Sequence, residues 1–260
     1  MKRALLLLLL LPTAMIGQKI NDAVWITEKH DGYQLHYTPS DLQNKNTYGM
    51  LLDQGMLTVK TFFHSTYPQL FNVYVHPRRH SLDSAWQKDW NMPDFKSECW
   101  MVASGIATKL DMISPKQWDR EACEHVYGET TKTQQLITHE LVHVYHGQRN
   151  ASPDFSDTEG IDWFVEGLAT YASGQCDSIR LAEVKIALAD DKIPKTLDQF
   201  WTGKLKYGLS GSMVMFIDKK YGRSKLSGLV PFRKKSELLN ALQTTESELL
   251  QGWQKFVLNV

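Results

Sequence analysis

The sequence has no excess charge of either sign and no repeated segments. Its 29 basic side chains are balanced by 29 acidic ones over 260 residues. No basic stripe is present, which argues against a nucleic-acid partner, because such partners select strongly basic surfaces. There is also no internal repeat, low-complexity tract or flexible linker. The length therefore fits one domain, or two closely packed lobes.

Cysteine is scarce: only Cys99, Cys123 and Cys176 are present. None of them has CxxC spacing, which argues against a cysteine-ligated zinc site. An odd number leaves at least one thiol free or bonded to another molecule. In an oxidising compartment we expect Cys99 to pair with Cys123. The alternative is that all three thiols are buried and reduced.

Long apolar runs are absent apart from one near the start of the chain. Lys2 and Arg3 precede an apolar run at residues 4–11, and small residues follow it. This pattern predicts a secretory signal peptide at residues 1–17, too short to span a bilayer comfortably. No cysteine lies near the expected cleavage before Gln18, which argues against a lipid anchor. We therefore expect a secreted or periplasmic protein without stable membrane insertion.

The stretch from Thr133 to His146 contains the pattern His-Glu-x-x-His. Its apolar residues have helical spacing, and positions four apart lie on one face of a helix. His139 and His143 can therefore offer two imidazole nitrogens to one ion. Two imidazoles with a third protein ligand suit Zn²⁺, which brings the pKa of a bound water near neutrality, and the neighbouring Glu140 can take the proton. The pattern predicts a zinc hydrolase, most simply a peptidase, against the alternative of an ordinary amphipathic helix.

A second helical run at residues 162–172 offers the third ligand. Glu166 lies there among apolar neighbours, where a carboxylate is costly unless it is paired or bound to a metal. Small residues beside it would let this helix approach the first one closely. We expect Glu166 to complete the site, against the alternative of a partly exposed surface carboxylate.

Together, His-Glu-Leu-Val-His at 139–143 and Trp-Phe-Val-Glu-Gly-Leu-Ala-Thr-Tyr at 163–171 resemble the gluzincin branch of zinc metallopeptidases. In particular they resemble the secreted bacterial peptidase-MA-like domains, to which residues 207–222 and 237–253 are also similar. The resemblance implies that His139, His143 and Glu166 bind one Zn²⁺ ion. It also implies that Glu140 is the general base and that a peptide or protein is the substrate.

The chain departs from the related aminopeptidases at two points. They carry the ligand carboxylate one helical turn earlier, at the position of Asp162. We prefer Glu166 because it has the Glu-Gly-Leu-Ala context, and keep Asp162 as the alternative. Those enzymes also carry a Gly-x-Met-Glu-Asn segment that captures the substrate's amino end. This chain lacks it, so an aminopeptidase activity is not supported.

Two further features concern how a substrate would be held. Attack on an amide creates an oxyanion that needs a donor besides zinc. Tyr207 is our candidate, because it precedes a small-residue segment expected to approach the site; a purely structural tyrosine is the alternative. In peptidases of this clan, the edge strand before the zinc helix binds extended peptide. By resemblance residues 100–107 are the candidate edge, with an internal strand as the alternative.

Strand patterns dominate the first half of the chain and helical patterns the second, which predicts an α+β fold. After the signal peptide we expect a single zincin-like metallopeptidase domain at 18–260. A small mixed sheet with a long helix at 41–67 would occupy 18–130, and a mostly helical lobe 131–260, with the zinc helix between them. Two other functions stay open: a non-catalytic binding module on this scaffold, and a zinc amidase acting on a cell-envelope peptide. The intact Glu140 argues against the binding module.

Overall fold

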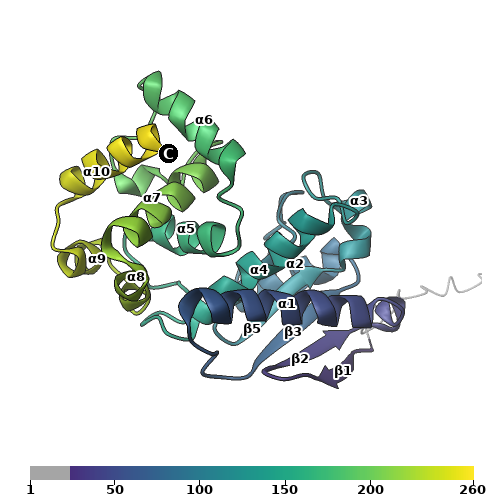
Figure 1. The fold of residues 1–260 in the computed structure, drawn as a ribbon. Helices are drawn as coiled ribbons and strands as arrows, with labels where there is room; N and C mark the ends of the chain where they lie inside the picture. Colours follow the sequence, from purple (N-terminus) through teal and green to yellow (C-terminus); the bar gives the residue numbers. More distant parts are fainter. Residues whose placement is uncertain (1–23) are drawn as a thin grey trace, which may run out of the picture.

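The computed structural model describes residues 24–260, so the expected signal peptide lies outside the described residues. Within them the fold is α+β and mostly helical (Figure 1). The five strands are β1 (Ile26–Lys29), β2 (Tyr33–Tyr37), β3 (Phe71–His76), β4 (Ala103–Ile106) and β5 (Lys109–Ile113). The helices are α1 (Lys45–Phe63), α2 (Arg79–Asp89), α3 (Trp118–Glu121), α4 (Thr130–Gly147), α5 (Asp162–Ala172), α6 (Ser178–Ala189), α7 (Lys206–Tyr221), α8 (Arg223–Leu229), α9 (Lys235–Leu242) and α10 (Glu246–Asn259).

The strands form one mixed sheet in the order β1-β2-β3-β5-β4. β1 and β2 pair antiparallel around Gly32, whose positive φ of 92° suits the turn that Asp31-Gly32 predicts. β3 is parallel to β2 and β5, and β4 returns antiparallel to β5. β4 is therefore an edge strand, which confirms the expected edge within residues 100–107.

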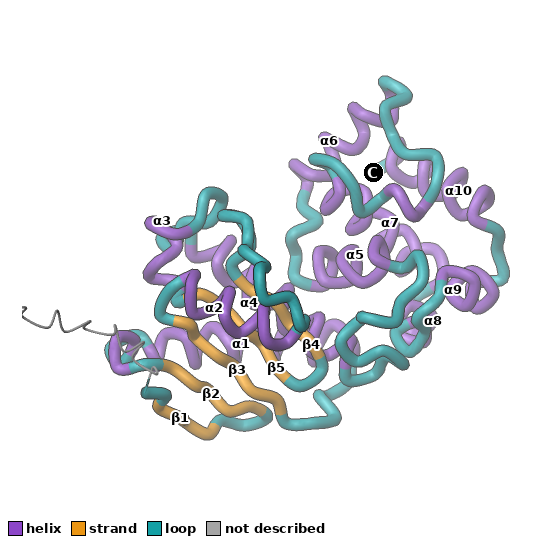
Figure 2. Tube along the Cα trace, turned by 180° about the vertical axis from the view of Figure 1, so that it is seen from behind, coloured by secondary structure: helices purple, strands orange, loops and turns teal. Residues whose placement is uncertain are grey.

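Helices cover the sheet on both faces. α1 and α4 lie against one face and α2 against the other (Figures 1 and 2). α1 and α4 cross closely because Gly55 has no side chain: a Cβ there would lie 2.6 Å from Leu141 Cδ1. α1 is shorter than the predicted helix at 41–67, because His64 takes the left-handed conformation that ends a helix.

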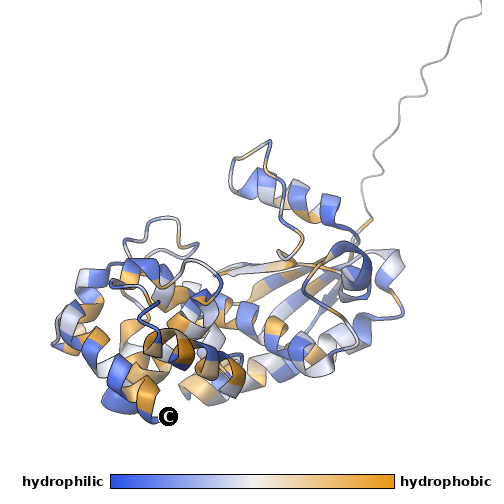
Figure 3. Ribbon diagram, turned by 90° about the horizontal axis from the view of Figure 1, so that it is seen from above, coloured by the Kyte–Doolittle hydropathy of each residue, from blue (hydrophilic) through white to orange (hydrophobic). Residues whose placement is uncertain are grey.

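The second half of the chain is helical, since every described strand ends by Ile113. α5 packs between α4 and α7. Its contact with α7 depends on Gly167, where a Cβ would lie 2.4 Å from the Ser210 carbonyl oxygen. Figure 3 shows hydrophobic and hydrophilic residues alternating along these helices, as expected when each buries one stripe. Within residues 24–260, none of the helices has the length and apolar content needed to cross a bilayer.

A disulfide joins Cys99 to Cys123, which confirms the favoured pairing, and Cys176 is a free, buried thiol. Arg79 binds the two segments that this disulfide joins. Its guanidinium donates to the carbonyl oxygens of Cys99, Met101 and Glu121. The segment before β4 is thus fixed to the segment after α3 by one covalent bond and several charge-assisted hydrogen bonds.

Replacing Cys99 and Cys123 together by serine should lower the free energy of unfolding by roughly 3 kcal/mol, because the bond closes a loop of 24 residues. For a chain of this size that corresponds to a Tm lower by about 6–12 °C. Circular dichroism on heating measures it. Reductant should lower the Tm of the unmodified protein and leave the double variant unchanged; an unmodified protein insensitive to reductant would contradict the prediction.

Candidate metal centre

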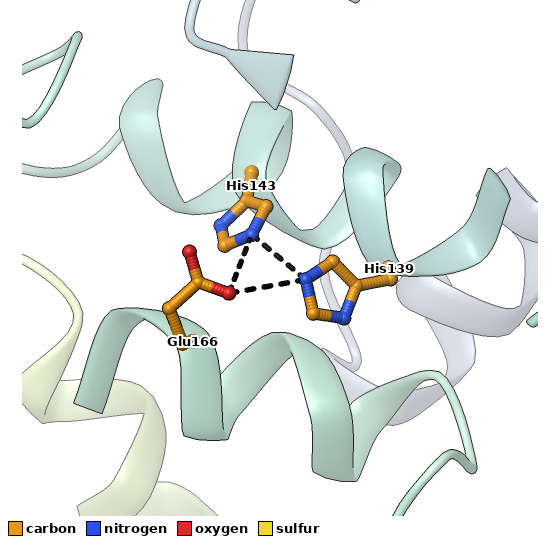
Figure 4. A group of neighbouring side chains, drawn as sticks. All are labelled: His139, His143 and Glu166. Carbon is orange, nitrogen blue, oxygen red and sulfur yellow. Dashed lines mark hydrogen bonds and ion pairs between the residues drawn. The ribbon is translucent and has the colours of Figure 1, made fainter. Parts of the chain in front are cut away.

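Three side chains from two helices converge on one point (Figure 4). His139 and His143 lie one turn apart on α4, with their Nε2 atoms 3.0 Å from each other. Glu166 reaches them from α5, with its Oε2 atom 3.3 Å from the His139 nitrogen and 3.6 Å from the His143 nitrogen. Tetrahedral zinc ligands, each about 2.0–2.1 Å from the ion, lie roughly 3.3 Å apart. The three atoms therefore fit a single ion of this kind.

The hydrogen bonding of His139 suits a metal ligand. Its Nδ1 atom lies 2.9 Å from the side-chain oxygen of Gln175. An amide oxygen can only accept, so Nδ1 carries the proton and, in the neutral ring, Nε2 keeps its lone pair for an ion. His143 Nδ1 is buried without a hydrogen-bond partner in the described part of the chain.

The carboxylate of Glu166 is charged and reachable. Burial by itself would raise its pKa, but the imidazoles of His143 and His139 outweigh burial and hold the pKa well below its usual range. Both histidine side chains are 8% exposed, whereas the Glu166 side chain is 26% exposed. The group therefore opens to solvent on the Glu166 side, where a further ligand could enter.

Glu140 lies beside this group, and the pKa of its carboxyl suits a proton acceptor. Burial is the main cause that raises the pKa of its carboxyl to about 7, and the charge of Glu166 raises it further. His139 and the backbone of Gly105 act in the opposite direction. A carboxylate whose pKa lies near neutrality can both take and return a proton at physiological pH.

The edge strand β4 lies directly on this part of α4. Gly105 makes the approach possible, because a Cβ there would lie 2.3 Å from the Glu140 carbonyl oxygen and 3.1 Å from His143 Cβ. Ile113 donates its N–H to the Val102 carbonyl, so in the antiparallel pair the backbone groups of Ala103 and Gly105 face away from β5. No other strand among residues 24–260 pairs with this edge, but the Gly105 N–H interacts with the Glu140 carboxyl and the Ala107 N–H donates to the Pro153 carbonyl.

Tyr207, at the start of α7, also lies at the centre. Its ring centroid is 6.3 Å from that of His139, in an edge-to-face arrangement. Burial chiefly raises the pKa of its phenol, and the charges of Glu166 and Glu140 add to the effect. The hydroxyl therefore stays protonated and can donate, and within residues 24–260 no group accepts a hydrogen bond from it.

Other residues near the motifs do not join the three converging atoms. Asp162 begins α5, is exposed, and is absent from the converging group. His146 is fully buried beside Asn150, and burial lowers its pKa to about 3. Asp157 and Glu159 pair with arginine and lysine side chains of the α8–α9 region.

Sequence reasoning missed Gln175, the acceptor for His139. It follows α5 directly after Gly174, which has a positive φ of 80°. A glycine of this kind ends a helix and reverses the chain, and here the reversal returns the chain to α4, where Gln135 donates to the Gly174 carbonyl. Gly174 could have indicated a chain reversal at this point. It does not indicate that the side chain of Gln175 would contact His139.

Truncating Gln175 to alanine should weaken zinc affinity by about 10- to 100-fold, because the ring of His139 loses the acceptor that fixes its orientation and tautomer. Competition with a fluorescent zinc chelator measures the affinity. The matched control is Gln251→Ala, since Gln251 is an exposed glutamine of α10. Equal affinity in both variants would show that the hydrogen bond does not support the centre.

No protein-family model matches the chain. No curated protein matches it either.

Proposed function

We propose that this protein is a secreted zinc-dependent peptidase of the gluzincin type. The observation that carries the proposal is the convergence of two imidazole nitrogens and one carboxylate oxygen within 4.8 Å, with a second carboxylate on the adjoining residue. The residue pattern at 139–143 and 163–171 and the α+β arrangement support the zincin-like assignment. The signal-peptide pattern at residues 1–17 supports secretion.

His139, His143 and Glu166 would hold the ion. When bound, zinc supplies a Lewis acid and lowers the pKa of water toward neutrality. Their two neutral nitrogens and one oxygen are a donor set that zinc enzymes use for hydrolysis. Gln175 keeps the His139 ring in the tautomer that presents Nε2.

Glu140 acts as the general base. Its carboxylate can take a proton from the attacking water and deliver it to the leaving amine, since its pKa of about 7 allows both directions. Tyr207 can donate its phenolic hydrogen to an oxyanion formed on the substrate. Both roles use groups that the fold already places around Glu166.

The outer edge of β4, which pairs with no other strand in the described part of the chain, would hold the substrate. An extended peptide can add to an exposed edge through main-chain hydrogen bonds, which give affinity without demanding a particular side chain. Because Gly105 lies against Glu140, a peptide bound there would pass close to the general base. This arrangement favours a peptide substrate over a small amide.

The proposal is tested with the mature protein in three states: zinc-loaded, stripped with a chelator, and reloaded. Casein and internally quenched peptides report hydrolysis, and atomic absorption reports bound zinc. We expect about one zinc per chain, with activity that disappears and returns with the metal. Peptide binding without hydrolysis in the loaded state would identify a binding module instead. Hydrolysis confined to cell-envelope peptides would identify an amidase of that kind.

A further inference from the structure

We infer that this centre selects substrates presenting a carboxylate, which Lys206 and Arg180 bind beside Tyr207. The inference rests on the proposed peptidase function and adds the substrate class to it. The carboxylate belongs either to an acidic side chain or to the C-terminus of a peptide. Both sources offer the same planar anion, and the test below separates them.

Lys206 is held at one edge of the centre by aromatic rings. Its Nζ atom lies 4.5 Å from the ring centroid of Trp100, 4.6 Å from that of Trp201, and 5.3 Å from that of Tyr207. Three rings around one ammonium group fix its position and partly shield it from water. The ammonium therefore meets an incoming anion at a defined place, with little loss of side-chain freedom.

Arg180 supplies a second cation near the same tyrosine. Its guanidinium carbon lies 5.3 Å from the Tyr207 ring centroid, and one nitrogen donates to the backbone carbonyl of Gln175. The remaining N–H groups of the fork are available to a planar anion. Tyr207 thus lies near two cations and next to His139.

Neither cation is neutralised by the protein. In the described part of the chain no carboxylate lies within ion-pair distance of Lys206 or Arg180, whereas Lys109 and Arg223, for example, each pair with one. The nearby Glu140 and Glu166 belong to the metal centre. Glu124 also faces Tyr207, but it forms no ion pair with either cation. The start of α7 has no side-chain cap, so its free N–H groups add to the positive potential.

Trp100, one of the three rings around Lys206, is held in place by several bonds. Trp100 follows Cys99, which is bonded to Cys123, and its carbonyl oxygen accepts a hydrogen bond from His125 Nε2. Arg79 holds the carbonyl groups on both sides of Trp100. The Trp100 ring therefore comes from the sheet-rich half of the chain and meets Lys206 of the helical half. An anion site built this rigidly is suited to selecting a substrate group.

The test compares matched peptides with the zinc-loaded mature protein. One series carries Glu at successive positions of an internally quenched peptide, and its partner series carries Gln. A second pair has a free or an amidated C-terminus. We expect the acid to exceed its amide in kcat/KM by about tenfold, as for a hydrogen-bonded ion pair. The pair that shows the difference identifies the source of the carboxylate.

Lys206→Gln should reduce this preference to about threefold or less, and Lys206→Arg should keep it. Lys204→Gln is the matched control, because Lys204 is exposed two residues away. Arg180→Gln should also reduce the preference, and zinc content and Tm show that each variant is folded. Rising salt should lower the turnover of acid peptides more than that of amides.

Cleavage of acid and amide peptides at equal rates would overturn the inference while leaving the peptidase function intact. A preference that survives both Lys206→Gln and Arg180→Gln would overturn it as well. Failure to cleave any peptide would instead count against the proposed function. In that case equilibrium binding of the same peptides, followed by tryptophan fluorescence, still decides whether the cations select the acid form.

Discussion

Glu140→Gln is expected to bind zinc as tightly as the unmodified protein and to hydrolyse peptides about 10²- to 10⁴-fold more slowly. Glutamine has nearly the same shape as glutamate, so it can occupy the space between α4 and Gly105 without moving the strand. It cannot take a proton. Because His139, His143 and Glu166 are untouched, the metal content should stay at one ion per chain.

The measurement pairs zinc analysis with kcat/KM on an internally quenched peptide. Glu129→Gln is the control, since Glu129 is an exposed glutamate at the start of the same helix. It removes one negative charge from α4 without touching the centre, and its activity should match that of the unmodified protein. If Glu140→Gln retains full activity, Glu140 is not the general base.

Glu166→Ala should abolish stable zinc binding and, with it, the stabilisation that zinc provides. A ligand present at 100 times its dissociation constant stabilises the folded state by about 2.7 kcal/mol, which for a chain of this size is roughly 5–11 °C in Tm. The unmodified protein should show a rise of this order on adding zinc. The variant should show almost none, because two imidazoles alone leave the ion without its only anionic ligand.

Thermal unfolding with zinc and with a chelator measures this difference for each protein. Asp162→Asn is the informative control, because Asp162 is the alternative ligand on the same helix, one turn earlier. Its zinc-dependent rise in Tm should equal that of the unmodified protein. If Asp162→Asn loses the rise and Glu166→Ala keeps it, the third ligand is Asp162.

Local sequence patterns were sufficient to predict those features whose geometry depends on a single helix or hairpin. The spacing of His139 and His143 places both rings on one face of a helix, whatever that helix packs against. Asp31-Gly32 predicts the β1–β2 hairpin, and Thr245 with Glu248 predicts the capping box that begins α10. Each of these features depends on backbone geometry within a few residues.

Long-range contacts decided the rest. Whether Glu166 or Asp162 meets the two imidazoles depends on how α5 is rotated against α4, and the close contact of Gly167 with α7 sets that rotation. Gln175 reaches His139 across 36 positions of the chain. Such pairings follow from how whole elements pack, so no local pattern specifies them.

The sequence by itself determined that the two imidazoles share one helix face, that a carboxylate adjoins them, and that strands precede helices. Helical and strand periodicity depend on residues that are close together in the chain. Only the tertiary structure decided that Gly105 lies against Glu140, that Gln175 orients His139, and that Trp100 meets Lys206. The reason is physical: these contacts join segments distant in the chain, and their geometry is set by the shared core that α1, α4, α5 and α7 bury together.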